Sequence, residues 1–219
     1  MQPVYILFGI ISFSLLLFLG MSVYIISGLI KTPASSKASY LHGPTPAVSV
    51  LIAMRNEGFY IDDLINSLAK QIYPPESFEL IIVDDQSDDW HFNKVKDRLL
   101  RSSLLHYKLL RNPGAGKKEA LAYGVKCAAN EMIVQTDGDV TVGPMWLWGM
   151  TRQLLNKHNG VVLGQVEMVS GKDLWSKYAA LDFLSLQAAT LGFVNKQNPI
   201  MANGANLSFM RETYFRFRK

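Results

Sequence analysis

The chain has 219 residues, of which 49% are hydrophobic, and a formal net charge of +4 at pH 7. This length has room for one membrane segment and one compact domain. The lysines and arginines are scattered, with no long basic run and no alternation of basic and aromatic residues, which argues against a nucleic-acid-binding protein. Cys127 is the only cysteine, so an intrachain disulfide is excluded and a small core side chain is expected there.

The first segment of the chain predicts a membrane anchor. Residues 3–30 contain no charged side chain, and a helix of that length exceeds the roughly 30 Å of a hydrocarbon core. The alternative is a cleaved signal peptide, but Met1 and Gln2 lack the basic charge that such a peptide begins with. Because Lys31 and Lys37 follow the span, we expect a single-pass membrane protein whose remaining residues lie in the cytoplasm.

A linker and then one α/β domain are expected after the anchor. Residues 31–46 are rich in Pro, Ser and Ala and have no apolar period, so the domain is predicted to occupy residues 47–219. Strand-like and helix-like stretches then alternate. This alternation predicts a Rossmann-like, mostly parallel sheet with helices on both faces. The expected strands are 48–54, 80–83, 104–110, 132–135 and 160–166, and the expected helices are 61–71, 91–100, 117–129 and 144–156.

Polar clusters follow three of the predicted strands. They are Arg55-Asn56-Glu57, residues 84–89, and Asp137-Gly138-Asp139. In an open parallel sheet, ligands bind beyond the carboxyl ends of the strands, where these clusters are expected to meet. Any one of them could be an ordinary turn. Together they favour a ligand site.

The triplet Asp137-Gly138-Asp139 has the chemistry of a metal and diphosphate site. Mg2+ and Mn2+ prefer carboxylate oxygens and complete their coordination with water and substrate phosphates. Gly138, without a side chain, would let a diphosphate approach the backbone closely.

A second phosphate-binding candidate precedes the helix predicted at residue 117. The segment 114–118 is not a P-loop, because Arg111 stands where that pattern needs Gly and Lys118 where it needs Ser or Thr. A turn that opens a helix and carries lysines can still attract phosphate, so Lys117 is a candidate ligand. An ordinary turn with solvated lysines remains the alternative.

Taken in order, these stretches resemble glycosyltransferase family two, whose members have the GT-A fold and transfer sugars from nucleoside diphosphates with inversion. The resemblance extends over roughly residues 47–212. The matching stretches are residues 48–57, 78–89, 116–121, 136–139 and 203–212.

The resemblance implies a role for each candidate residue. Glu57 would line the nucleoside pocket, and Asp85 would accept a hydrogen bond from the imide N–H of a uracil-like base. Lys117 would lie near the nucleotide or phosphate. Asp137 would contact the ribose or sugar, and Asp139 would bind the metal that bridges the phosphates.

The resemblance also implies the floor of the site and its partners. The segment Asn203, Gly204, Ala205, Asn206 would form the floor between donor and acceptor. The partners would be a nucleoside-diphosphate sugar, most simply a UDP-sugar, the lipid bilayer, and an acceptor (polysaccharide, lipid or protein) on which the sequence is silent.

The sequence departs from the family pattern near its end. The family's general base is an Asp in a Glu-Asp or similar pair downstream of the Gly-Ala-Asn segment, and no such pair occurs before Lys219. Glu212 comes too early, and Asp182 lies within an apolar helix-like stretch. We therefore expect the donor-binding part of the fold here, with the general base beyond Lys219.

One further apolar stretch has two possible interpretations. The apolar stretch 173–191 predicts a helix that either belongs to the core or contacts the bilayer or acceptor. Trp146 and Trp148 are expected in the core, and the four histidines show no metal-ligand spacing.

Two other functions remain open at this stage. A membrane-tethered phosphoacceptor receiver would also place Asp84, Asp85 and Asp137 at strand ends, but it leaves the strand at 48–54 unused and needs a Lys-Pro that is absent at a fifth strand end. A non-catalytic nucleotide-sugar-binding protein would be consistent with the absence of a general base before Lys219.

Overall fold

The structure is a computed structural model that describes residues 2–30, 45–155 and 160–217. Its residues form two units. One contains the sheet and comprises residues 36–164 and 203–219, and the other comprises residues 1–35 and 165–202. The expected linker falls largely outside the described residues, because 31–44, with Lys31 and Lys37, are not described.

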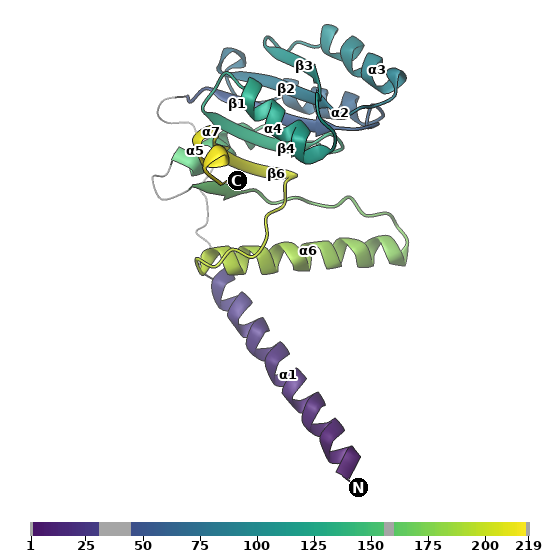
Figure 1. The fold of residues 1–219 in the computed structure, drawn as a ribbon, viewed down its shortest axis with the longest axis vertical. Coiled ribbons are helices and arrows are strands. Elements are labelled where there is room, and N and C mark those ends of the chain that lie inside the picture. Colours follow the sequence, from purple (N-terminus) through teal and green to yellow (C-terminus); the bar gives the residue numbers. More distant parts are fainter. Residues whose placement is uncertain (1, 31–44, 156–159, 218–219) are drawn as a thin grey trace. The chain divides into compact units, whose positions relative to one another are not determined.

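Six strands form one mixed sheet in the order β3-β2-β1-β4-β6-β5 (Figure 1). The four parallel strands are β1 (Val48–Met54), β2 (Phe78–Asp84), β3 (Tyr107–Arg111) and β4 (Met132–Asp137). Next to β4, β6 (Asn206–Met210) runs antiparallel, and β5 (Val161–Leu163) pairs antiparallel with β6. The prediction of a mostly parallel sheet is confirmed. The strand expected over 160–166 is shorter and antiparallel to its neighbour, and β6 was not predicted.

Helices cover both faces of the sheet, as expected. On one face α2 (Ile61–Ala69), α3 (Asp89–Leu100) and α5 (Trp146–Leu155) pack into one hydrophobic cluster. On the other face α4 (Lys117–Cys127) and α7 (Arg211–Phe217) contribute to a second cluster. A short 3-10 helix, η2 (Pro75–Ser77), precedes β2. Every residue of β1 and β2 is buried, which explains why their sequences are continuous apolar runs.

The second unit consists mainly of two long helices. These are α1 (Gln2–Leu29) and α6 (Leu174–Asn195), the latter confirming the helix expected over 173–191. Among the described residues, Val4–Leu29 is the one helix long and apolar enough to cross a membrane, judged by length and composition.

A buried carboxylate ties the strands together at the amino edge of the sheet. Glu79 Oε1 accepts hydrogen bonds from Ser49 Oγ at 2.6 Å and from the Ala129 N–H at 2.7 Å, while Lys108 Nζ lies 2.9 Å from Glu79 Oε2. Burial by itself would raise the pKa of Glu79. The hydrogen bonds from Ser49, Lys108 and Ala129 outweigh it and hold the pKa below its ordinary value of 4.5.

We predict that Glu79→Gln lowers the free energy of unfolding at pH 7 by about 1–3 kcal/mol, because the charge-assisted bond to Lys108 is lost. Since the folded-state pKa is depressed, the carboxylate's contribution is complete above the ordinary pKa of 4.5 and disappears as pH falls through the folded-state value. Denaturant unfolding of both proteins in detergent at neutral and acidic pH measures this. A stability difference that stays constant down to acidic pH contradicts the assignment.

Candidate functional site

The register of the parallel strands brings the polar clusters to one edge of the sheet. Met54 pairs with Asp84 and Ala53 pairs with Asp137, so the loops after β1, β2 and β4 start at neighbouring points. Because β6 is antiparallel, its first residue, Asn206, pairs with Thr136 at the same edge. All three predicted clusters and the segment 203–206 therefore lie at the carboxyl edge.

The loops after β1 and β2 are joined by hydrogen bonds. The Asn56 N–H donates to Ser87 Oγ at 2.8 Å, and Asn56 Oδ1 accepts from the Asp88 N–H at 2.9 Å. Asn56 has a φ of 56°, a left-handed conformation that asparagine adopts more readily than most residues. This backbone conformation turns the chain immediately before Glu57.

Asp85 anchors the turn that precedes α4. Its side chain is buried, and its Oδ1 accepts hydrogen bonds from Asn112 Nδ2 at 2.7 Å and from the Gly116 N–H at 2.8 Å. Gly116 has a φ of 92°, which requires glycine at this helix start. The sequence did not single out Asn112. Its position directly after β3 at the same edge was the one available signal.

Glu57 lies directly against the Asp-Gly-Asp loop. A Cβ on Gly138 would lie 2.2 Å from Glu57 Oε2, so the absence of a side chain at Gly138 makes room for that carboxylate. Among the described residues, Glu57 Oε2 is buried and has no hydrogen-bond partner. Burial raises the pKa of Glu57, the negative charge of Asp139 adds to the rise, and Lys117 opposes it.

Lys117 and Asp137 form an ion pair across the same edge. Lys117 Nζ lies 2.7 Å from Asp137 Oδ1, with the lysine side chain 54% exposed and the aspartate 25% exposed. Asp139, two residues further on, is exposed. The structure thus brings together Glu57, Lys117, Asp137 and Asp139, as the sequence predicted.

The donor set fits a divalent cation that shares its coordination with a ligand. Within the described residues, no group of three or more His, Cys, Asp or Glu side chains forms a metal cage by itself. Mg2+ commonly binds through only one or two carboxylates together with water and substrate phosphates. The exposed Asp139, with Asp137 beside it and the unpartnered oxygen of Glu57 nearby, matches that requirement.

Hydrogen bonds from β4 hold the segment 203–206. Gln135 Nε2 donates to the Gly204 carbonyl at 2.8 Å, and Thr136 Oγ1 donates to the Ala205 carbonyl at 2.9 Å. Asn203 Oδ1 accepts from the Ala205 N–H at 2.9 Å. Gln135 and Thr136 are buried polar residues that the sequence analysis did not identify.

The two tryptophans expected in the core differ from each other. Trp148 is 6% exposed and belongs to the core cluster, as predicted. Trp146 only packs against that cluster, and its Nε1 donates to Asn206 Oδ1 at 2.9 Å. The core assignment of Trp146 is therefore incomplete, because its indole N–H also positions the segment 203–206. Cys127 is half-buried rather than a core residue.

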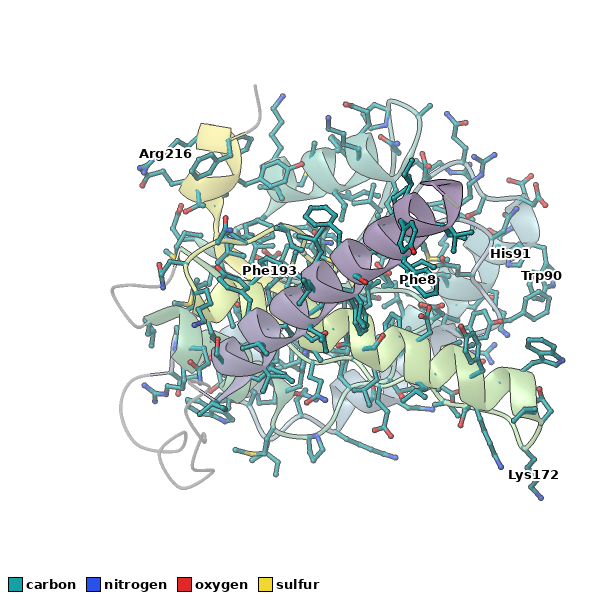
Figure 2. All side chains as sticks on the ribbon, turned by 90° about the horizontal axis from the view of Figure 1, so that it is seen from below. Phe8, Trp90, His91, Lys172, Phe193 and Arg216 are labelled. Carbon is teal, nitrogen blue, oxygen red and sulfur yellow. The ribbon has the colours of Figure 1, made fainter. Side chains whose placement is uncertain are left out.

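An aromatic group borders the loops after β1 and β2. The rings of Phe59 and Trp90 lie 4.9 Å apart, and Trp90 lies 4.6 Å from His91 (Figure 2). His91 Nδ1 accepts a hydrogen bond from the Gly58 N–H at 3.1 Å. Sequence reasoning assigned none of these residues, because their contacts join loops far apart in the chain.

Comparison with protein families gives one match over most of the chain. The family model described as Glycosyl transferase family 2 matches residues 49–217. Among curated proteins, the poly(ribitol-phosphate) beta-N-acetylglucosaminyltransferase TarS of Staphylococcus aureus is 31% identical over 125 residues, which are 57% of this chain and 22% of TarS. The beta-monoglucosyldiacylglycerol synthase of Synechocystis is 34% identical over 97 residues, 44% of this chain and 19% of that protein. The chain thus spans about a fifth of the length of these relatives.

Solved structures agree on the fold. The mannosyltransferase PcManGT from Pyrobaculum calidifontis, in complex with GDP-Man and Mn2+, matches with a TM-score of 0.72 at 21% identity over 95% of this chain and 57% of that one. TarS residues 1–349 in complex with UDP match with a TM-score of 0.50 at 27% identity over 58% of this chain and 38% of that one. The described sheet and its helices therefore have the architecture of known glycosyltransferases, the GT-A fold expected from the sequence.

Proposed function

Because this chain belongs to glycosyl transferase family 2, we propose that it acts as a membrane-anchored enzyme that takes a sugar from a nucleoside-diphosphate sugar and transfers it, with inversion, to an acceptor. The observation that carries the proposal is the convergence of Glu57, Asp85, Lys117, Asp137 and Asp139 at the carboxyl edge of the sheet. Such an edge is where open α/β sheets bind ligands.

Asp85 would recognise the base of the bound nucleotide. Its Oδ1 accepts hydrogen bonds from Asn112 and Gly116, and among the described residues no hydrogen bond to Oδ2 occurs. Oδ2 would accept the imide N–H of uracil, and a charged acceptor makes this bond strong. We favour a UDP-sugar because TarS, at 27% identity, is solved with UDP, whereas PcManGT, at 21%, informs the fold alone.

Lys117 and the Asp-Gly-Asp loop would hold the diphosphate. Lys117 is the first residue of α4, so its ammonium group and the positive end of the helix would act on the same phosphates. In this proposal Asp137 orients Lys117 and contacts the ribose or sugar, while Asp139 holds the divalent cation. When bound, Mg2+ or Mn2+ would offset charge on the departing diphosphate. Glu57 would line the nucleoside side of the same loop, and the segment 203–206 would separate donor from acceptor.

The membrane anchor would be residues 3–30, followed by a linker over 31–46 and the glycosyltransferase domain over 47–219 on the cytoplasmic side. The described helix Val4–Leu29 supports the anchor, since its most apolar stretch of 18 residues has a mean hydropathy of 2.4 and no residue of that stretch is buried. A helix that leaves so many apolar side chains uncovered needs an apolar surrounding.

The receiver alternative does not fit the observed sheet. Receiver domains have an all-parallel sheet in the order 2-1-3-4-5. Here β6 inserts antiparallel between β4 and β5.

The base-reading role of Asp85 predicts a selective loss in Asp85→Asn. The amide keeps an oxygen for Asn112 and Gly116, but its NH2 group would face the imide N–H, so UDP affinity should fall by about 1.5–3 kcal/mol, tenfold or more. The affinity for pyrophosphate should change little. Calorimetric titration of the full chain in detergent measures both, with Asp97→Asn on α3 as the matched control. Equal losses for UDP and pyrophosphate would remove the base-reading role.

The metal role of Asp139 predicts that Asp139→Ala abolishes the gain in UDP affinity that Mn2+ confers. In the presence of a chelator, the UDP affinity of Asp139→Ala should stay close to that of the parent, because the contacts of Asp85 with uracil and of Lys117 with phosphate remain. The same titrations, with and without Mn2+, test this, and Asp97→Ala serves as the control. If Mn2+ strengthens UDP binding equally in parent and variant, the cation is held elsewhere.

A further inference from the structure

The loop after β1 is tied to the segment after β2 on both sides of Glu57. On the side before it, Asn56 makes two hydrogen bonds, at 2.8 and 2.9 Å, with residues 87 and 88. On the side after it, the buried Gly58 donates its N–H to His91 Nδ1 at 3.1 Å. Two separate contacts therefore fix the backbone that carries the Glu57 side chain.

The contact with His91 depends on the chemistry of its acceptor. A histidine nitrogen accepts a hydrogen bond only when it carries no hydrogen, so the ring hydrogen of this neutral imidazole lies on Nε2. Because a buried backbone N–H without an acceptor is costly, the bond stabilises the observed course of the loop over others. An acceptor at this place, rather than the bulk of the ring, is what the Gly58 N–H requires.

Gly58 and two aromatic rings keep the contact close. A Cβ on Gly58 would lie 3.0 Å from His91 Nδ1 and 3.2 Å from His91 Cα, so even an alanine there would press on the start of α3. The imidazole packs edge-to-face with Trp90, at 4.6 Å and 86° (Figure 2), and with Phe59, at 5.3 Å and 79°. These rings constrain the direction in which Nδ1 points.

Glu57 needs such anchors because its surroundings disfavour its charge. Burial and the negative charges of Asp139 and Asp137 raise its pKa, and its Oε2 is buried with no hydrogen-bond partner among the described residues. The positive charge of Lys117 and the Gly138 N–H act in the opposite direction. Since the net effect opposes a carboxylate at this place, the backbone contacts on either side have to hold it there.

We propose that His91 is a positioning residue of the donor site. By accepting the Gly58 N–H, its Nδ1 holds the loop after β1 so that the Glu57 carboxylate stays against the Asp-Gly-Asp loop. The inference rests on the proposed function, in which this edge binds a nucleoside diphosphate and Glu57 lines its nucleoside side. Without the acceptor, binding would have to order the loop first, and this cost would lower the affinity.

Two replacements of nearly equal size test the role of the acceptor. His91→Leu removes it, whereas His91→Asn places an amide oxygen close to the position of Nδ1. In calorimetric titrations of the full chain in detergent with UDP and Mn2+, His91→Leu should bind about tenfold more weakly than the parent. His91→Asn should recover most of that loss. The control is His106→Leu, a change at an exposed histidine just before β3, and it should bind like the parent.

A double-mutant cycle shows whether His91 acts through Glu57. Glu57→Ala should itself weaken UDP binding, and His91→Leu should then cause little further loss in that background. Gly58→Ala leaves the sequence of α3 unchanged and crowds the same contact, so it should weaken UDP binding in the parent and not in Glu57→Ala. A general structural effect would lower the affinity by the same factor in both backgrounds, and that result would overturn the proposal.

The remaining outcomes separate this inference from the function on which it rests. If the unmodified chain binds UDP and His91→Leu binds it equally well, the role of His91 is overturned and the proposed function stands. The same holds if His91→Leu and His91→Asn lose affinity equally, since the acceptor is then not what matters. If the unmodified chain does not bind UDP, the proposed function fails, and the role of His91 fails with it.

Discussion

The parallel register of β1 with β2 and β4 is the constraint on which the site depends. Met54 is level with Asp84, and Ala53 is level with Asp137, so three polar loops leave the sheet at one edge. Side-chain bonds then fix each loop. The two hydrogen bonds to Asp85 Oδ1 hold the turn before α4, and that turn places Lys117 beside Asp137 at 2.7 Å. A change in strand register would separate all of these groups at once.

Two glutamates at opposite edges of the sheet differ in their hydrogen bonding and in the direction of their pKa shifts. Glu79, at the amino edge, is satisfied by Ser49, Lys108 and Ala129, and its pKa is lowered. Glu57, at the carboxyl edge, has a buried oxygen with no partner among the described residues and a raised pKa. A satisfied carboxylate stabilises the fold. An unsatisfied one beside Asp139 carries an energetic cost that a bound ligand or cation would relieve.

Much of the fold could be predicted because strands buried on both faces, such as 48–54 and 78–84, leave continuous apolar runs in the sequence. The antiparallel direction of β5 and β6 could not be predicted, since the periodicity of apolar residues does not show whether a short strand pairs parallel or antiparallel. The acidic clusters were visible in the sequence, whereas Asn112 and Gln135 were not, because a single polar residue at a strand is uninformative until its partner is known. The α1–α6 contact joins residues too far apart in the chain for local patterns to reveal it.

In the proposed function, the carboxyl edge of the sheet binds a nucleoside diphosphate together with a divalent cation. Equilibrium titration of the unmodified chain in detergent with UDP, in Mn2+ and in chelator, tests it most directly, with an acyl-phosphate mimic as the comparison ligand. We expect that UDP binds, that Mn2+ tightens the binding, and that the acyl-phosphate mimic has no effect. Failure to bind UDP in either condition would contradict it.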